Sequence, residues 1–429
     1  MPRKSIAHRI RTVFFWMHLA MGVSAGVIIL LMSVTGVMLG YERQMIAWID
    51  GVPRATVPEL AADGMSGPAA SPSDRFATAR LPLDTLLARA AVDRAAVASM
   101  VIKAGATDPV SVRFRDRANP SLALDPYSGA VIPAPQGESG QAFFSGLRRW
   151  HRWMGASAAD ARATARNITG TANLIFLFIV LSGLYLWWPN HWSRARLRTH
   201  TVFQPRLHGK ARDFNWHHTL GFWSAIPLAI VVATGVFISF QWPERWLDRA
   251  LGSAEEKAAV IAAASGEESG AARGVGTAAS DAAISLEAAE PPPLPHAASL
   301  ADVFAAAQQA RPEWRQVTLT LAAPQDSTHT VLVAEGNTYR PDLRTTFDVH
   351  TETAERVATR DFSSLSTARK IRAWVRFGHT GEVFGIAGQT VATLVTLAGA
   401  FLVWTGFSLA YRRLTSWRRR RRRLASAQG

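Results

Sequence analysis

The 429-residue chain contains no cysteine. This absence excludes disulfide bonds, thiolate-bound iron–sulfur clusters, cysteine-ligated zinc and covalently attached c-type haem. Any bound metal must therefore rest on histidine or carboxylate side chains. The net charge of +15 would suggest nucleic acid as a partner if the fold were soluble. However, the hydrophobic residues, 48% of the chain, are concentrated in long runs, and these runs indicate a membrane protein.

Four apolar windows are long enough to cross the hydrocarbon core of a bilayer, which needs roughly 20 helical residues. We therefore predict four membrane-spanning helices, at about residues 13–39, 168–188, 214–240 and 383–410. The first window follows a basic leader, as the core of a cleavable signal peptide would. Its apolar stretch is too long for a signal peptide and no small-residue cleavage site follows promptly, so we predict a retained membrane anchor.

Lysine and arginine residues set the predicted orientation in the membrane. They cluster before the first span, between spans two and three and after span four, at Arg3, Lys4, Arg9, Arg11, Arg194, Arg196, Arg198, Arg206, Lys210, Arg212, Arg412, Arg413 and Arg418 to Arg423. An even number of spans puts these clusters on one side. Both termini are therefore expected in the cytoplasm, and the two long connections in the periplasm of a bacterial inner membrane. For the terminal arginine run we favour a topology anchor over recognition of anionic lipid or nucleic acid.

Each long connection has the pattern of one helix followed by short antiparallel strands. In the first, a linker-like stretch at 57–74 precedes a helix at 83–98 and three strands at 99–103, 110–115 and 121–124, after which a turn at 125–129 leads to 130–132. In the second, a low-complexity stretch at 253–295 precedes a helix at 300–310 and strands at 316–321, 328–334 and 345–349. Each connection is therefore predicted to form a small α+β domain.

The spans also repeat within the chain. Ser33-Val34-Thr35-Gly36-Val37 in the first span matches Val232-Ala233-Thr234-Gly235-Val236 in the third. In both spans a histidine lies 18 residues before the glycine of this stretch: His18 before Gly36, and His217 before Gly235. We therefore predict two copies of span, outer domain and span, joined head to tail in a parallel relation, with a pseudo-twofold axis along the membrane normal.

The predicted fold class is an α-helical integral membrane protein, with a four-helix transmembrane bundle and two small α+β periplasmic domains, internally duplicated. Only the four spans are expected to lie within the lipid bilayer. The fold requires the bilayer as a partner. The parts in order are a cytoplasmic leader (1–12), the first span (13–41), the first periplasmic domain (42–150), an interfacial segment with the second span (151–188), a cytoplasmic basic loop (189–213), the third span (214–241), a linker with the second periplasmic domain (242–378), the fourth span (379–411) and an arginine-rich cytoplasmic tail (412–429).

Four histidines lie at predicted membrane depth, where an ionisable side chain is costly and indicates function. His18 and His217 fall in the first turns of spans one and three, at the cytoplasmic end. His151, in an amphipathic segment before span two, and His379, about one turn before the apolar part of span four, both lie at the outer face. They pair by depth, His18 with His217 and His151 with His379. His218 is an alternative to its neighbour His217.

Glycines accompany these histidines at helical spacing. Residues four apart share a helix face, and glycine lets a flat group approach the backbone beside an imidazole. This spacing occurs in the pairs His18 and Gly22, His151 and Gly155, and His217 and Gly221. Gly36 and Gly235 follow five whole helical turns after His18 and His217, at 3.6 residues per turn, and return to the same stripe near the opposite face.

We infer two noncovalent b-type haems, one near each face, because facing helices of a bundle supply axial histidines in this way. Their iron would be bound by His18 with His217 and by His151 with His379. One alternative is that the histidines are interfacial polar residues and that the glycines are helix–helix contacts. Another is zinc or copper on the same imidazoles.

Five stretches, in this order, resemble the PepSY-associated transmembrane proteins over nearly the whole chain. They are His18-Leu19-Ala20-Met21-Gly22, His151-Arg152-Trp153-Met154-Gly155, Leu181-Ser182-Gly183-Leu184-Tyr185-Leu186-Trp187-Trp188-Pro189, His217-His218-Thr219-Leu220-Gly221-Phe222-Trp223 and His379-Thr380-Gly381. This group is also known as iron-regulated membrane proteins and includes inner-membrane siderophore reductases. The resemblance implies two periplasmic PepSY modules, bound haem and, in some members, reduction of ferric siderophore complexes.

The expected function is thus a di-haem b oxidoreductase that passes electrons to the periplasmic face and reduces ferric siderophores, because hard oxygen ligands hold ferrous iron weakly. The short cytoplasmic segments lack a glycine-rich dinucleotide motif, so the electrons are expected from membrane quinol or a separate reductase. The alternative is a binding or regulatory protein whose PepSY modules grip peptides or partner proteins without redox activity. A transporter is disfavoured because the spans lack buried charge and, apart from Pro227, proline interruptions.

Overall fold

The computed structural model describes residues 6–57, 80–116, 118–119, 121–133, 139–189, 193–253, 298–323 and 325–426. The chain divides into two compact units. We call them the helical unit (Met1–Asp50, Gly137–Glu244 and Arg372–Gly429) and the sheet unit (Gly51–Gln136 and Arg245–Ile371). The start of the basic leader and nearly all of both predicted linkers lie outside the described residues.

The described part of the helical unit consists of long helices and short connecting ones. Its elements are α1 (Ile6–Leu39), α2 (Glu42–Ile49), α6 (Ser139–Trp153), α7 (Ala159–Trp187), α8 (Arg194–Thr201), α9 (Gly209–Ser239), the 3-10 turn η6 (Glu382–Phe384) and α14 (Gly385–Ser426), with parts of α10 (Trp242–Leu251) and α13 (Thr367–Thr380). Four helices among the described residues, α1, α7, α9 and α14, are long and apolar enough to cross a membrane. Each of the four predicted spans thus coincides with one helix that could cross a membrane.

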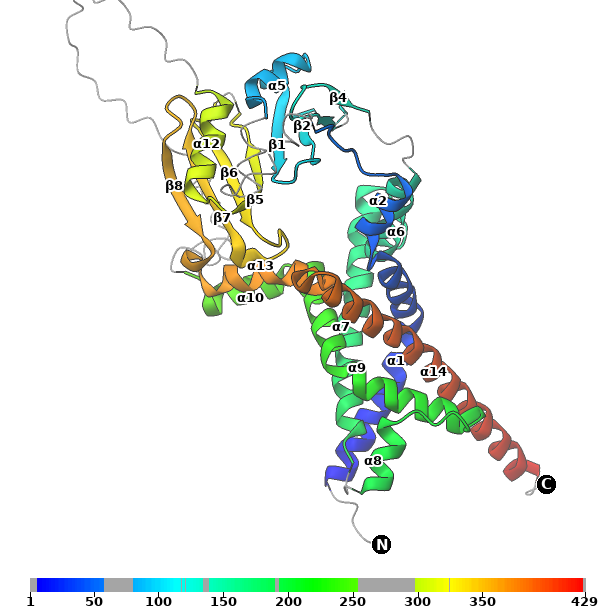
Figure 1. The fold of residues 1–429 in the computed structure, drawn as a ribbon. Helices are drawn as coiled ribbons and strands as arrows, with labels where there is room; N and C mark the ends of the chain where they lie inside the picture. The colour runs from blue at the N-terminus through cyan, green and yellow to red at the C-terminus, as the bar shows by residue number, and fades with distance from the viewer. Residues whose placement is uncertain are drawn as a thin grey trace, which may run out of the picture. The chain divides into compact units, whose positions relative to one another are not determined.

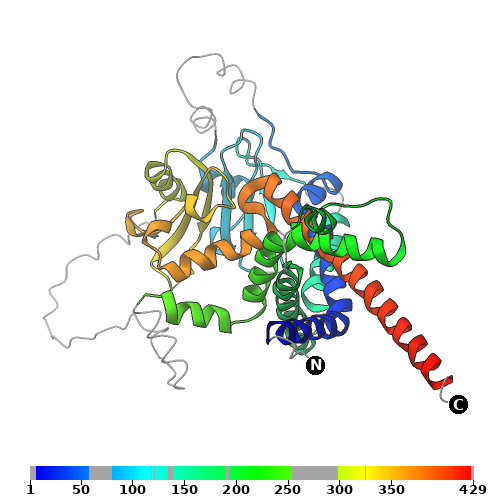
Figure 2. The same ribbon diagram turned by 90° about the horizontal axis from the view of Figure 1, so that it is seen from below.

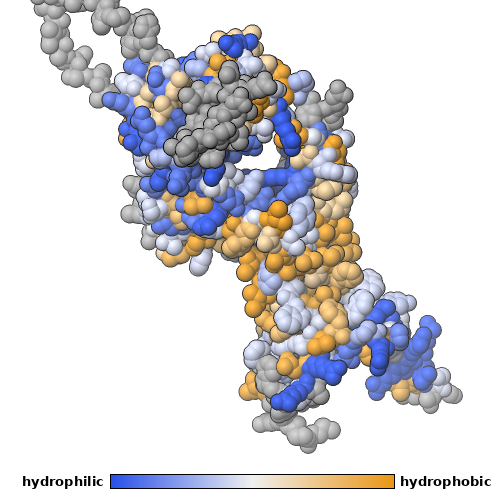
Figure 3. Space-filling view, in the orientation of Figure 1, coloured by the Kyte–Doolittle hydropathy of each residue, from blue (hydrophilic) through white to orange (hydrophobic). Residues whose placement is uncertain are grey.

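The four long helices form a closed ring in which each contacts two neighbours. α1 and α9 each pack against both α7 and α14 (Figure 1). The small core between them is made of Ala25, Ile29, Ala172, Phe176, Val180, Leu228, Val232 and Val395. Hydrophobic residues also dominate the visible outer surface of these helices (Figure 3), as expected for helices that face lipid.

Helix α14 continues well beyond the predicted end of the fourth span. It runs through the arginine run to Ser426 and past the other helices of its unit (Figures 1 and 2). Its last part contains no glycine or proline, and arginine is a good helix former. The polar residues of this part are visible in Figure 3.

Two short helices of the helical unit end in left-handed backbone. After α6, Met154 and Gly155 have φ of 51° and 85°, and after α13, Gly381 has φ of 75°. The N-terminus of α6 is held by the carboxylate of Asp50, which accepts hydrogen bonds from the backbone N–H groups of Gly140 and Gln141, both at 2.8 Å.

The described part of the sheet unit contains one antiparallel sheet and two main helices. Its elements are α5 (Leu83–Arg89), η2 (Arg94–Ala96), β1 (Val97–Lys103), β2 (Val110–Phe114), β3 (Leu122–Leu124), β4 (Val131–Ile132), α12 (Leu300–Ala310), β5 (Trp314–Thr320), β6 (Thr328–Glu335), η4 (Pro341–Leu343), β7 (Arg344–His350), β8 (Arg356–Asp361) and η5 (Phe362–Ser364). The eight strands follow the order β4-β3-β2-β1-β5-β6-β7-β8.

The two strand groups, which the sequence assigns to two domains, share this one sheet. Strands β1 and β5 join them in antiparallel pairing, with Ser99 opposite Thr320 and Lys103 opposite Gln316. Helices α5 and α12 contribute to one common core with the strands, made of residues such as Leu86, Met100, Leu300, Val303, Leu319 and Phe347. Each group therefore closes an edge that the other would leave open.

Two details of the sheet unit differ from the sequence prediction. The helix expected at 83–98 ends at Arg89, because Ala91 takes a left-handed φ of 53° and Asp93 then caps the short turn η2 through the Ala95 N–H. Strand β8 was not predicted, because nearly all of its side chains are exposed and no alternation of polar and apolar residues marks it.

His329 on β6 is a buried titratable group of the sheet unit. It is 4% exposed, and its Nδ1 accepts a hydrogen bond from the Ala322 N–H at 2.9 Å. Burial, followed by the charges of Arg94 and Arg115, lowers the pKa of His329 below its usual value of 6.5. The unfolded chain therefore binds this proton more tightly than the folded chain does.

We predict that the sheet unit loses stability as the pH falls from about 7.5 to about 5, since a lowered histidine pKa stabilises the fold above the unfolded pKa and stops doing so below it. The His329→Gln variant should show a flatter pH dependence. The measurement is hydrogen exchange of sheet-unit peptides in the full-length protein, with His350→Gln on β7 as control. An equal slope for wild type and His329→Gln would contradict the prediction.

Candidate functional site in the helical unit

The histidines His18 and His217 meet between opposite helices of the ring. His18 lies on α1 and His217 on α9, and their ring centroids are 6.4 Å apart with planes at 82°. We call them the first pair. Two imidazoles on opposite sides of one metal ion, each with a bond of about 2.0–2.1 Å, have ring centres roughly 6 Å apart. The observed separation fits that arrangement.

The second pair, His151 and His379, comes from the two short helices. His151 lies in the last turns of α6 and His379 in the last turn of α13. Burial, followed by the neighbouring His379, lowers the pKa of His151 to about 4. Burial likewise lowers the pKa of His379. In both cases the lowered pKa favours the neutral imidazole, which is the form that binds a metal.

Each of the four imidazoles faces a serine or threonine hydroxyl on a neighbouring helix. The distances from Nδ1 to the hydroxyl oxygen are 3.0 Å for His18 and Ser182, 2.9 Å for His217 and Thr405, 3.0 Å for His151 and Thr35, and 3.2 Å for His379 and Thr234. These contacts link α1 to α7, α9 to α14, α6 to α1 and α13 to α9. The pattern is thus the same at all four positions.

The direction of these hydrogen bonds follows from the hydroxyl protons. Each hydroxyl also reaches a backbone carbonyl within its own helix: Leu31 at 2.7 Å for Thr35, Ile179 at 3.2 Å for Ser182, Ile230 at 2.8 Å for Thr234 and Phe401 at 2.8 Å for Thr405. A carbonyl only accepts, so the hydroxyl donates to it, and the hydroxyl oxygen accepts from the imidazole.

At His379 a backbone carbonyl identifies the imidazole proton a second time. Nδ1 of His379 lies 2.8 Å from the carbonyl oxygen of Val231, three residues before Thr234, so this nitrogen must carry a proton. Together with the direction of the four hydroxyl contacts, this places a proton on Nδ1 of each imidazole and leaves a lone pair on Nε2.

A glycine follows each hydroxyl residue and lies against the same imidazole. A methyl group in its place would come close to the ring carbon Cε1, at 3.3 Å for Gly36 and His151, 3.2 Å for Gly183 and His18, 3.2 Å for Gly235 and His379, and 3.7 Å for Gly406 and His217. At the first three positions a side chain would displace the ring. We call the four dipeptides sockets: Thr35–Gly36, Ser182–Gly183, Thr234–Gly235 and Thr405–Gly406.

The predicted glycines divide into two groups. Gly36 and Gly235 lie beside the second pair of histidines, within their sockets. Gly22 has open space where a side chain would start, and Gly221 has one ordinary contact, with Leu402. The interpretation of Gly155 was wrong. It does not share a helix face with His151, because α6 ends at Trp153 and Gly155 turns the chain in left-handed backbone.

Of the neighbours His217 and His218, only His217 lies in a socket. The ring of His218 instead packs on Phe214 at 4.2 Å and on His200 at 4.7 Å, measured between ring centroids. One turn before His217, the fully buried Asp213 accepts hydrogen bonds from Arg212 at 2.9 Å and from Ser408 at 2.6 Å. The helix end beside the first pair is thus fixed by a compensated charge.

Sequence patterns alone do not mark the socket hydroxyls as functional residues. The signal was present, because a serine or threonine followed by glycine occurs in each of the four spans, at Thr35, Ser182, Thr234 and Thr405. A dipeptide this common points to nothing until the histidine that it contacts is known. The recurrence in all four spans was the usable part of the signal.

The arrangement suits a ligand that brings most of its own metal donors. Among the described residues there is no group of three or more histidine, aspartate or glutamate side chains that could hold a metal ion. Zinc sites in proteins use three or four protein ligands. Two neutral imidazoles, each with Nε2 available and Nδ1–H held by an acceptor, are instead what this chain would need to supply to hold a haem.

Comparison with known proteins agrees with the motifs. The family model described as PepSY-associated TM region matches residues 15–413. No curated protein matches the chain.

Proposed function

The chain belongs to the family of the PepSY-associated transmembrane region, and from that premise we propose that it is a di-haem b oxidoreductase. It would act in a bacterial inner membrane and reduce ferric iron in siderophore complexes at the periplasmic face. The observation that carries the proposal is the fourfold socket, which leaves Nε2 of His18, His217, His151 and His379 free to bind a metal.

In this proposal the four histidines would hold the haems, and the socket residues orient the histidine rings. His18 and His217 would hold one haem b, and His151 and His379 the other, each noncovalently through Nε2. Bound haem would supply one-electron redox chemistry, which no side chain of this chain provides. The sockets fix the ring orientation. Because their hydroxyl oxygens accept a hydrogen bond from Nδ1–H, they also make each imidazole a stronger ligand. Open space at Gly22 leaves room for a flat group beside the first pair.

Two observations support the internal duplication that this arrangement needs. His18 and Thr35 on α1 are 17 residues apart, and so are His217 and Thr234 on α9. The strand order of the sheet is also symmetric about the β1–β5 pair. We propose two halves in parallel relation, each contributing one histidine to each pair, with the sheet unit in the periplasm.

The proposed substrate is an iron chelate, and iron is therefore cargo here. One electron converts Fe³⁺ to Fe²⁺, which hard oxygen ligands hold less tightly, so the metal leaves and the chelator stays intact. Membrane quinol or a separate reductase would donate the electron. The alternative of a binding or regulatory protein without redox activity predicts normal function of a haem-free protein.

We predict that His18→Ala and His379→Ala each lower the haem content of the purified protein from two to about one per chain, because each removes one of the two imidazoles that would hold a haem. The measurement is the absorption of dithionite-reduced protein against a protein assay. His350→Ala, on a strand of the sheet unit, is the control and should retain both haems. A wild-type protein without b-type absorption, or unchanged content in both variants, would reject the proposal.

We predict that Thr405→Val raises the midpoint potential of one of the two haems and weakens its binding on the order of 10–100-fold, because the Nδ1–H of His217 loses its hydroxyl acceptor. Thr405→Ser should restore both properties, since it returns the hydroxyl. A spectroelectrochemical titration measures the potentials. The matched control is Thr415→Val, because the Thr415 hydroxyl also bonds to its own helix, at Tyr411, but faces no histidine. Equal shifts in both valine variants would show that the socket plays no part.

The predicted orientation can be tested cleanly because the chain has no native cysteine. A cysteine placed at Thr353 in the sheet unit should react with a membrane-impermeant maleimide in intact spheroplasts. A cysteine at Ser416 on α14 should react only after permeabilisation, because the arginine-rich end is expected in the cytoplasm. The reverse labelling pattern would overturn the orientation.

A further inference from the structure

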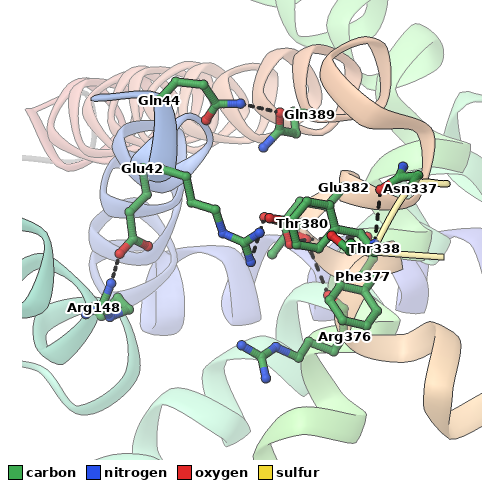
Figure 4. Close-up of polar contacts among 12 residues, drawn as sticks. Glu42, Gln44, Arg148, Asn337, Thr338, Arg376, Phe377, Thr380, Glu382 and Gln389 are labelled. Carbon is green, nitrogen blue, oxygen red and sulfur yellow. Dashed lines mark hydrogen bonds and ion pairs between the residues drawn. The ribbon is translucent and has the colours of Figure 1, made fainter. Parts of the chain in front are cut away.

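The short helix α2 contacts both of the segments that carry the second histidine pair. Its first three residues, Glu42, Arg43 and Gln44, bond through their side chains to three different elements (Figure 4). Consecutive residues of a helix point about 100° apart, so three in a row cover more than half of its circumference. One short helix can therefore hold several neighbours at once. We call these three residues the clamp.

The clamp holds the end of α6 that carries His151. Glu42 forms an ion pair with Arg148. Arg148 lies three residues before His151, on the same face of α6. At the other end of α2, the C-cap residue Asp50 accepts hydrogen bonds from two backbone N–H groups at the start of α6, both at 2.8 Å. Helix α6 is therefore attached to α2 at its start and again within one turn of its histidine.

The clamp also holds the chain beside His379. Arg43 forms an ion pair with Glu382 at 3.2 Å. The same carboxylate accepts a hydrogen bond at 2.9 Å from the hydroxyl of Thr380, the residue that follows His379. The Glu382 side chain is only 11% exposed. Loss of its positive partner would leave a poorly compensated charge, so this ion pair contributes more than one in open water does.

The turn that follows His379 is closely packed against the start of α14. Gly381 has a left-handed φ of 75°, and a methyl group in its place would overlap the carbonyl oxygen of Gly388. The next residue, Gln389, is buried, and its side-chain oxygen accepts a hydrogen bond at 2.8 Å from the amide of Gln44. The third clamp residue is thus attached to the part of α14 that fixes this turn.

The second pair needs such support more than the first pair does. His18 and His217 lie within the long helices α1 and α9, whose positions are fixed by the closed ring. His151 and His379 lie instead in the last turns of short helices that end in left-handed backbone. Helix ends open locally more easily than packed interiors. The sockets orient these two rings, and the clamp holds the backbone from which the rings extend.

We propose that Glu42, Arg43 and Gln44 are positioning residues that fix His151 and His379 relative to each other. That both imidazoles are thereby placed to hold one haem rests on the proposed function. The order of the charges makes the clamp specific. Its acid meets an arginine on α6, and its arginine meets an acid after α13, so a clamp bound the other way round would bring like charges together.

The test compares Arg43→Gln with Arg43→Lys in full-length protein as purified, because lysine keeps the positive charge. The matched control is Arg360→Gln in the sheet unit. The side chain of Arg360 is 47% exposed, against 45% for Arg43, and it pairs with Asp348 at 2.8 Å. Like Glu382, Asp348 also accepts a hydrogen bond from a threonine hydroxyl. The measurements are hydrogen exchange of residues 379–390 and the electron paramagnetic resonance of ferric haem.

Arg43→Gln should speed amide exchange at residues 379–390 about tenfold, as the loss of a charged hydrogen bond implies. The g values of one haem should change and those of the other should stay as in the wild type, because the clamp contacts only the segments of the second pair. Arg43→Lys should behave as the wild type does, and Arg360→Gln should alter neither measurement. Glu42→Gln should speed exchange on α6 instead.

Equal exchange at residues 379–390 in Arg43→Gln and Arg360→Gln would overturn the clamp. Where haem is bound, a changed signal of both haems, or of neither, would also overturn it. The outcome is separable from that of the proposed function, because hydrogen exchange requires no haem. A haem-free wild type in which Arg43→Gln still speeds exchange would support the clamp and end the oxidoreductase proposal. Two normal haems with equal exchange would do the opposite.

Discussion

The position of one proton on each imidazole is the constraint on which the helical unit depends. A histidine can bind a metal through Nε2 only if Nδ1 keeps the proton, and that proton needs an acceptor. Among apolar helices no water supplies one. In this chain the acceptor is a hydroxyl oxygen. The hydroxyl donates its own proton to a backbone carbonyl of its helix, so its oxygen accepts the hydrogen bond from Nδ1–H, as at Thr35 and Thr405. The glycine that follows has no side chain, so the imidazole ring fits beside it.

The sockets also explain how the helices are held in register. Association of helices in lipid relies on close packing and on polar contacts, because apolar burial gives little preference for one neighbour over another. Each socket joins a different pair of neighbours, α1 to α7, α9 to α14, α6 to α1 and α13 to α9. The residues that orient the imidazoles are therefore the same residues that fix the ring of helices, and the site and the fold depend on each other.

The two histidine pairs are alike in their hydrogen bonds but unlike in their electrostatic surroundings. Near the first pair, the buried Asp213 is balanced by Arg212 and Arg412. Near the second pair, Arg152 and Arg376 have no matching acid among the described residues. Positive charge beside one of the proposed haems would favour its reduced form, because the added electron is attracted. Charge rather than ligand type would thus distinguish two otherwise equivalent sites.

The sequence predicts the parts of this molecule that local patterns encode. The spans follow from apolar length, and the choice of His18 and His151 as candidate ligands follows from the cost of an ionisable group at predicted membrane depth. The sockets could not be predicted, because each hydroxyl lies 116 to 188 residues from its histidine. A spacing of four residues is also misleading when the backbone turns left-handed within it, as it does at Gly155. Two residues at helical spacing share a face only if one helix contains both. Whether it does depends on where the helix ends and not on the number of residues between them.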